Sequence, residues 1–207
     1  MKCRANQFFA DERKNMKDDT LDRRIKYTKN QLKSAMVTLL GERHISKISV
    51  KSLCEVADVN RSTFYSHYKD QYDLLEQIRR EALENIRRYL EDYSNTGDMS
   101  VSEKNLKMIL EYGKSNAELF KAFLSDNCDI AFKEDVMELL RIVPSSFGSI
   151  SPGKTRDYIT VLMLTGCISI LQRWLQEGMP ESTREMSKMI MTVLQAINHG
   201  FDKFRNI

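Results

Sequence analysis

Apolar residues recur every three or four positions along most of the chain, which is the spacing of one face of an α-helix. Only three prolines and eight glycines interrupt the pattern, and runs of β-branched residues are few, which favours helices over a sheet. The predicted fold class is therefore all-α. The spacing predicts helices over residues 27–42, 50–57, 61–69, 71–93, 102–114, 116–125, 129–143, 158–175 and 182–204.

Residues 49–69 predict two short helices joined by a tight turn. Ser49 and Asn60 each precede one of these helices and have side-chain oxygens that can cap it. Between the helices, Asp58 and Asn60 tolerate a left-handed or turn backbone, while Val59 anchors the turn in the core. The segment is a predicted helix-turn-helix, and the apolar face of its first helix comprises Val50, Leu53, Val56 and Ala57.

The second of these helices separates an inward from an outward face. Phe64 and Tyr68 stand four residues apart and are predicted to point into the core. The outward face suits a DNA major groove, in which Arg61 would contact a guanine edge and Tyr65 a thymine methyl or a phosphate. Paired amphipathic helices also occur in proteins that never touch DNA. The predicted outward residues are Arg61, Ser62, Tyr65, Ser66 and Lys69, beside Thr63.

Charge favours the DNA-binding alternative. Residues 23–69 carry ten lysines and arginines against three acidic residues, a net charge of +7. Because the whole chain carries +3, the remainder is net −4. A basic segment in an otherwise acidic chain is typical of a phosphate-binding domain.

The run from Thr28 to Leu75, and above all the block S-T-F-Y-x-H-Y-K at residues 62–69, resembles the DNA-binding domain of TetR-type transcriptional regulators. The resemblance implies that Tyr65 and His67 face DNA. Two positions depart from the family pattern, since Asp58 replaces a common turn glycine and Gln71 a frequent lysine. The predicted DNA-contacting set is Thr28, Lys29, Ser49, Lys51, Arg61, Ser62, Thr63, Tyr65, His67 and Lys69.

Residues 94–98 (SNTGD) give the clearest linker signal and divide the chain. We predict a flexible extension over 1–22, a DNA-binding domain with its connecting helix over 23–94, and a helical regulatory and dimerisation domain over 95–207. The segments 158–175 and 182–204 are long and apolar, which predicts a four-helix homodimer interface. Two DNA-binding domains related by a twofold axis would bind a palindromic, inverted-repeat operator.

The second domain is also predicted to hold a small apolar or aromatic effector. The alternative for each candidate lining residue is an ordinary core position. A repressor released by its ligand and an activator controlled by a partner protein both remain open. The candidate lining residues are Met108, Tyr112, Phe120, Phe123, Phe147 and Trp174.

Other functions find little support in the sequence. The chain contains no Gly-rich phosphate loop, no HExxH and no G-x-S-x-G, so we predict no enzyme. Its four cysteines are scattered without a CxxC pair, and Asp126, Cys128 and Asp129 lack a nearby histidine, so neither a metal nor another cofactor is predicted. We find no signal peptide and no membrane-spanning stretch, and expect a cytoplasmic protein.

Overall fold

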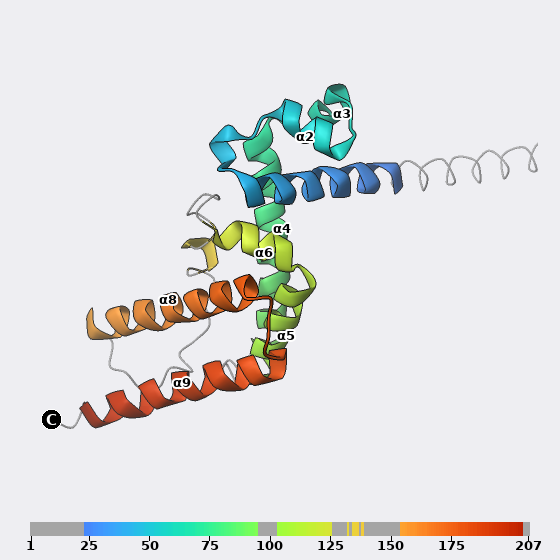
Figure 1. Cartoon of the computed structure of the whole chain (residues 1–207). Coiled ribbons are helices and arrows are strands. Elements are labelled where there is room, and N and C mark those ends of the chain that lie inside the picture. Colours follow the sequence, from blue (N-terminus) through green and yellow to red (C-terminus); the bar gives the residue numbers. More distant parts are fainter. Residues whose placement is uncertain are drawn as a thin grey trace, which may run out of the picture.

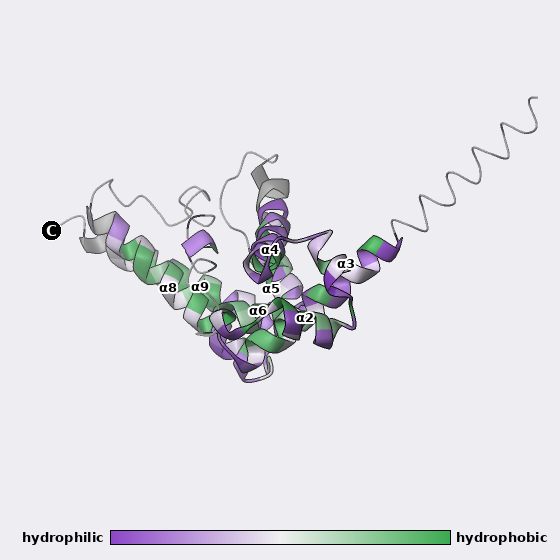
Figure 2. Ribbon diagram, turned by 90° about the horizontal axis from the view of Figure 1, so that it is seen from above, coloured by the Kyte–Doolittle hydropathy of each residue, from purple (hydrophilic) through white to green (hydrophobic). Residues whose placement is uncertain are grey.

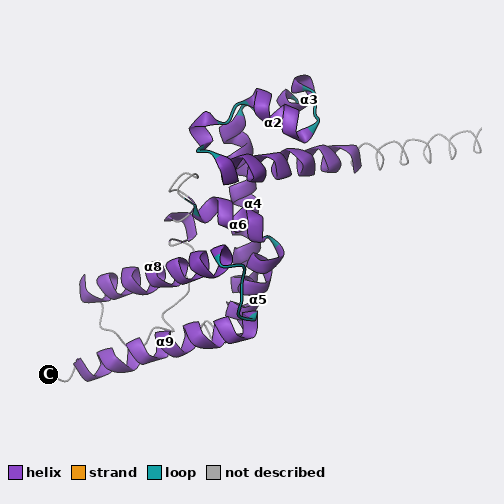
Figure 3. Ribbon diagram, viewed as in Figure 1, coloured by secondary structure: helices purple, strands orange, loops and turns teal. Residues whose placement is uncertain are grey.

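The computed structural model describes residues 23–94, 103–125, 132, 134–136, 138 and 154–204. All regular structure within these residues is helical and no strand occurs among them, which confirms the all-α prediction (Figure 3). The predictions for residues 1–22, the linker 95–98, the loop 144–153 and most of the helix 129–143 lie outside the described residues. The division into domains stays a prediction.

The N-terminal helix (23–42) and two short helices, α2 (Val50–Ala57) and α3 (Arg61–Tyr65), form a small unit that we call the head. The stripe predicted for the N-terminal helix is buried, and it consists of Leu32, Ala35, Met36, Leu39 and Leu40. A single 3₁₀ turn, η1 (Ile45–Lys47), precedes α2 and brings Ile45 and Ile48 into the core. The hydrophobic period did not predict this turn, because it is too short to show one.

A long helix, α4 (Gln71–Ser94), runs from the head into the rest of the molecule (Figure 1). It matches the helix predicted over 71–93. Leu74, Leu75, Ile78 and Ala82 bury its apolar face, and α5 (Glu103–Ser115) packs against it further along. The molecule thus has one continuous element between the head and the helices that follow.

Beyond α4, the remaining helices assemble around α5. Helix α6 (Ala117–Leu124) follows α5 and packs against α8 (Lys154–Gln176), while α9 (Thr183–Phe204) packs against α5. The break between α5 and α6 lies at Asn116, next to the gap between the predicted helices 102–114 and 116–125, and Gly113 remains inside α5.

Within the single chain, helix α8 buries one face and leaves apolar side chains exposed on another. Ile159, Met163 and Ile168 are buried, whereas Tyr158 and Leu162 remain exposed. Figure 2 shows the hydrophobic colouring of α8 and α9, which extend away from α4 and α5. On α9, Met189 and Val193 are likewise exposed. These exposed apolar side chains on the two helices have no partner in the described part of the chain, and together we call them the α8–α9 strip: Tyr158, Val161, Leu162, Met189 and Val193.

Two expectations need correction. Val56, assigned to the apolar face of α2, is 50% exposed, and buried Cys54 takes a core position on that helix. The stretch Asp157–Gln176 is long and apolar enough to cross a membrane by length and composition, contrary to our reading of the sequence. One such helix is weak evidence, since a core helix passes the same test, and here α8 buries one face against α6.

Candidate functional site

The first helix of the helix-turn-helix begins at a reciprocal cap. The backbone N–H of Ser52 donates to the Ser49 hydroxyl at 3.1 Å, and the N–H of Ser49 donates to the Ser52 hydroxyl at 3.1 Å. Two of the free N–H groups at this helix start are thereby satisfied. Ser49, which was predicted to contact DNA, therefore also uses its side chain to cap α2.

The turn between α2 and α3 depends on two residues that the sequence identified. Asp58 adopts the left-handed conformation, with φ 51° and ψ 47°, where the family commonly has glycine. Its N–H and that of Val59 donate to the Cys54 carbonyl, which closes α2. Asn60 then caps α3, because its Oδ1 accepts from the backbone N–H of Ser62 at 3.0 Å.

Helix α3 is fixed in orientation by its aromatic residues. Phe64 is fully buried and Tyr68 nearly so, with their ring centroids 5.6 Å apart. Tyr65 packs edge-on against Phe64 at 5.5 Å, yet 59% of it is exposed. Burial also raises the pKa of the Tyr68 hydroxyl above its usual value. The predicted division into inward Phe64 and Tyr68 and outward Tyr65 is confirmed.

Helix α3 spans Arg61–Tyr65 and is therefore shorter than the helix predicted over 61–69. The Ser66 hydroxyl donates to the Thr63 carbonyl at 2.7 Å, and the N–H of Lys69 donates to Asp73 Oδ2 at 2.9 Å. That bond, together with one from Gln77, holds the pKa of the Asp73 carboxyl below its usual value. Polar side chains thus end α3 and begin α4.

The structure places the predicted DNA-contacting residues on the head. Arg61, Ser62 and Lys69 are exposed around α3, while Thr63 and His67 are half-buried. Thr28 is half-buried and Lys29 exposed near the start of the N-terminal helix, which Figures 1 and 2 place beside α3. Lys51 is exposed on α2 and lies 3.8 Å from Glu55.

Sequence reasoning did not single out two exposed tyrosines, one on the head and one at the start of α4. Tyr27 immediately precedes Thr28, and Tyr72 lies in the first turn of α4. A tyrosine hydroxyl can donate to a phosphate. The available signal was their position off the buried stripes of their helices, since an apolar residue there has no core to fill.

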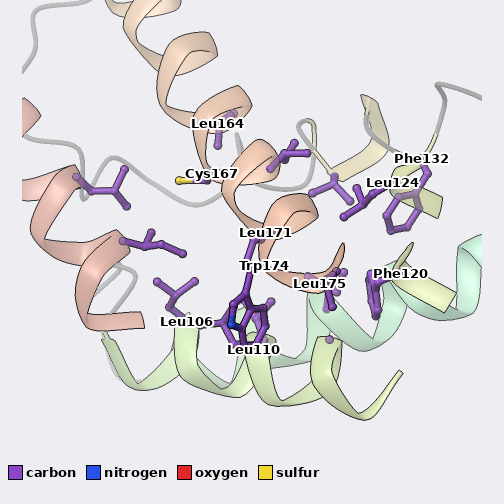
Figure 4. A pocket seen from close by; sticks show the side chains of 17 residues that line it. Leu106, Leu110, Phe120, Leu124, Phe132, Leu164, Cys167, Leu171, Trp174 and Leu175 are labelled. Atoms are coloured by element: carbon purple, nitrogen blue, oxygen red, sulfur yellow. The ribbon is translucent and has the colours of Figure 1, made fainter. Parts of the chain in front are cut away.

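A second candidate site is a cavity of about 140 Å³ among α4, α5, α6, α8 and α9 (Figure 4). Phe120 and Trp174 line it, as predicted for an effector site. Met108, Tyr112 and Phe123 are not among its described lining residues, and Phe147 lies outside the described residues. The lining residues missed by sequence reasoning include Ile86, Leu106, Leu110, Phe132, Leu164 and Cys167.

Tyr112 and Phe123 instead take structural positions next to the cavity. The Tyr112 hydroxyl accepts a hydrogen bond from the Asn85 side chain at 2.9 Å and joins α5 to α4, and burial raises its pKa. The Phe123 ring packs against Phe132 with centroids 4.5 Å apart. Both residues are aromatic and inward-facing, so the sequence alone could not show whether they line the cavity or pack beside it.

Taken with the fold, these sites define a class of protein: an all-helical chain with a helix-turn-helix head, joined by one long helix to a second helical unit that contains an apolar cavity. Residues 100–196 match the model of a TetR-type transcriptional regulator C-terminal region. This C-terminal region is therefore of the TetR type, and the chain as a whole has the fold of a TetR transcriptional regulator.

Individual relatives are distant. The HTH-type transcriptional regulator YxbF of Bacillus subtilis is 22% identical over 163 residues, which make up 77% of this chain and 43% of that protein. The chain therefore spans less than half the length of this relative. A TetR transcriptional regulator from Streptococcus agalactiae shares the fold with a TM-score of 0.61 at 24% identity, covering 86% of this chain and 98% of that one. NalD, the secondary repressor of an efflux pump in Pseudomonas aeruginosa, matches with a TM-score of 0.57 at 14% identity, covering 83% and 95%.

Proposed function

We propose that this regulator binds an inverted-repeat DNA operator as a homodimer and acts in the cytoplasm as a repressor. The observation that carries the proposal is the exposed surface of α3, where Arg61, Ser62 and Tyr65 project from a helix anchored by buried Phe64. A short helix held from behind can enter a major groove without losing its own packing. The basic charge of the head favours approach to DNA.

The homodimer follows from the α8–α9 strip. Large apolar side chains such as Tyr158 and Leu162, which is 64% exposed, gain free energy when a second surface covers them. A second copy of the chain presents the same strip on a twofold axis, as a closed symmetric dimer requires. Dimerisation also doubles the base contacts, which one short α3 cannot supply in sufficient number.

Control of DNA binding is assigned to the apolar cavity. A small apolar or aromatic effector that prefers one spacing of the two heads would shift the population towards that spacing. Ligand and operator then weaken each other's binding by the same factor. Helix α4 contributes Ile86 to the cavity and begins in the head, so it can carry this change.

The test selects operators from random double-stranded DNA with the full chain and measures affinity by fluorescence anisotropy. We expect an enriched inverted repeat, bound as two chains per site, and an affinity that falls steeply as salt rises. A matched control is Arg173→Ala, because Arg173 is exposed on α8 and pairs with Glu177 far from the head. Failure to enrich any repeat, or equal loss of affinity in Arg173→Ala and Arg61→Ala, would overturn the proposal. If occupation of the operator raised transcription of a reporter gene, the protein would be an activator and not a repressor.

A further inference from the structure

The wall of the cavity is almost entirely apolar. The described lining residues are aliphatic or aromatic apart from a glycine and Cys167, and no charged side chain is among them. The single indole N–H, that of Trp174, is already used, since it donates to the Glu181 carbonyl at 3.2 Å. A ligand inside therefore meets carbon surfaces and one neutral thiol.

The thiol adds little polarity. Cys167 lies on α8 beside Leu164 and Leu171 in the view of Figure 4. Burial raises the pKa of this thiol above its usual value, so it stays protonated at neutral pH and is a weak hydrogen-bond donor. A carboxylate or an ammonium group would lose its hydration in this cavity without gaining a partner from the described wall.

The volume sets the size of the ligand. A dry cavity of roughly 150 Å³ lined by leucine, isoleucine and phenylalanine holds one benzene ring. The present cavity, about 140 Å³ in volume, is of that size and is lined by the same residue types. Left empty, such a cavity forfeits contacts that its wall atoms would otherwise make.

We propose that the ligand of this cavity is an uncharged hydrocarbon or halogenated hydrocarbon about the size of a single aromatic ring. The inference rests on the proposed function for its regulatory meaning, but the binding itself does not depend on DNA. Compared with the small apolar or aromatic effector of the proposed function, this proposal excludes aromatic molecules that carry an ionised group and limits the size to about one ring.

Trp174 provides a direct signal, because it is the only tryptophan of the chain and lies in the cavity wall. The full-length protein is titrated with toluene, benzoate and benzylamine while tryptophan emission is recorded, and calorimetry gives the dissociation constants. We expect saturable binding of toluene and binding at least about 100-fold weaker for both charged analogues. Equal binding of a charged analogue, or no saturable toluene binding, would overturn the proposal.

A filling variant locates the site. Leu110→Phe adds atoms to the α5 wall and should weaken toluene binding by about tenfold or more. Met108→Leu is the matched control, since Met108 is half-buried on the same helix but does not line the cavity, and it should bind within about twofold of the parent. Leu164→Phe fills the cavity from α8 and replaces Leu110→Phe if that variant fails to fold, as judged by circular dichroism. Undiminished toluene binding in the folded filling variant contradicts the assignment.

Discussion

The guanidinium of Arg79 lies 3.2 Å from the carboxylate of Asp135, measured from Nε to Oδ2, and this ion pair joins α4 to the helical residues around Asp135. Phe132 and Val136, on either side of Asp135 in sequence, line the cavity. Arg79 also pairs with Glu76 one turn earlier on α4 and is only partly exposed. The pair therefore connects the cavity wall to the helix that begins in the head.

We predict that Asp135→Asn reduces the coupling between cavity ligand and operator. The variant removes the charge that ties the wall to α4, so displacement of Phe132 or Val136 would move α4 less. Typical coupling between two sites is about 5–150-fold, and we expect this factor to fall towards one. The measurement is operator affinity with and without saturating toluene.

The control for this prediction is Glu84→Gln. Glu84 forms an exposed pair with Arg88 at 4.0 Å on the same helix, away from the cavity lining. Both variants should lose at most about 1 kcal/mol of stability, because partly exposed ion pairs contribute little. An Asp135→Asn protein that keeps the full ratio of affinities would show that the signal takes another route.

Tyr65 and Phe64 are neighbours with opposite expected effects. Tyr65→Ala should abolish sequence-specific DNA binding and cost about 1 kcal/mol or less, since the exposed ring loses only its edge contact with Phe64. Phe64→Ala should cost about 3–5 kcal/mol, because it truncates a fully buried aromatic. Urea denaturation and operator titration of both variants test the pair. A collapse of stability in Tyr65→Ala would mean that its ring belongs to the core.

Local chemistry explains what the sequence could predict. The caps at Ser49 and Asn60 and the left-handed turn at Asp58 depend on residues next to one another in the chain, so their types alone determine the geometry. Buried Phe64 and Tyr68 followed from helical spacing in the same way. The expectation that Tyr65 and His67 face DNA came from the family resemblance and not from spacing, and it stays a prediction.

Tertiary arrangement explains what was missed. Val56 has a core-like residue type and spacing, yet no element among the described residues buries it, and it is 50% exposed. Helix α3 ends at Tyr65, and the N–H of Lys69 beyond it donates to Asp73 of the next helix, a contact that helical spacing does not reveal. The cavity lies among helices far apart in sequence, so Leu106 and Leu164 read as ordinary stripe residues until those helices are assembled.

Dimerisation can be tested at an exposed leucine of the α8–α9 strip. Leu162→Glu places a charge on an apolar surface that must be desolvated on association, so we expect a monomer at micromolar concentration and loss of cooperative operator binding. Val56→Glu is the matched control, since Val56 is an exposed apolar residue on the head. Analytical ultracentrifugation should find Val56→Glu dimeric, and a dimeric Leu162→Glu would place the interface elsewhere.

Two glycines should respond to alanine with opposite signs. Gly178, between α8 and α9, has φ of +83°, where a side chain is strained, so Gly178→Ala should lose about 1 kcal/mol. Gly113 lies inside α5 with open space around the position of a Cβ atom, so Gly113→Ala should gain about 0.5–1 kcal/mol. Thermal unfolding measures both, and a shift of the same sign in the two variants would contradict the assigned backbone strain.

Asp73 should make the junction of α3 and α4 sensitive to acid. The N–H of Lys69 and the Gln77 side chain donate to its carboxylate, so its pKa is lower in the folded chain than in the unfolded one. A group of this kind stabilises the fold fully above its unfolded pKa, roughly 4, and loses that contribution as the pH falls through the folded pKa. Asp73→Asn should therefore be less stable than the parent at neutral pH, and the difference should shrink below about pH 4. Urea denaturation of both proteins between neutral and acidic pH gives the difference, and a gap that stays constant or widens on acidification would mean that the charge of Asp73 does not support this junction.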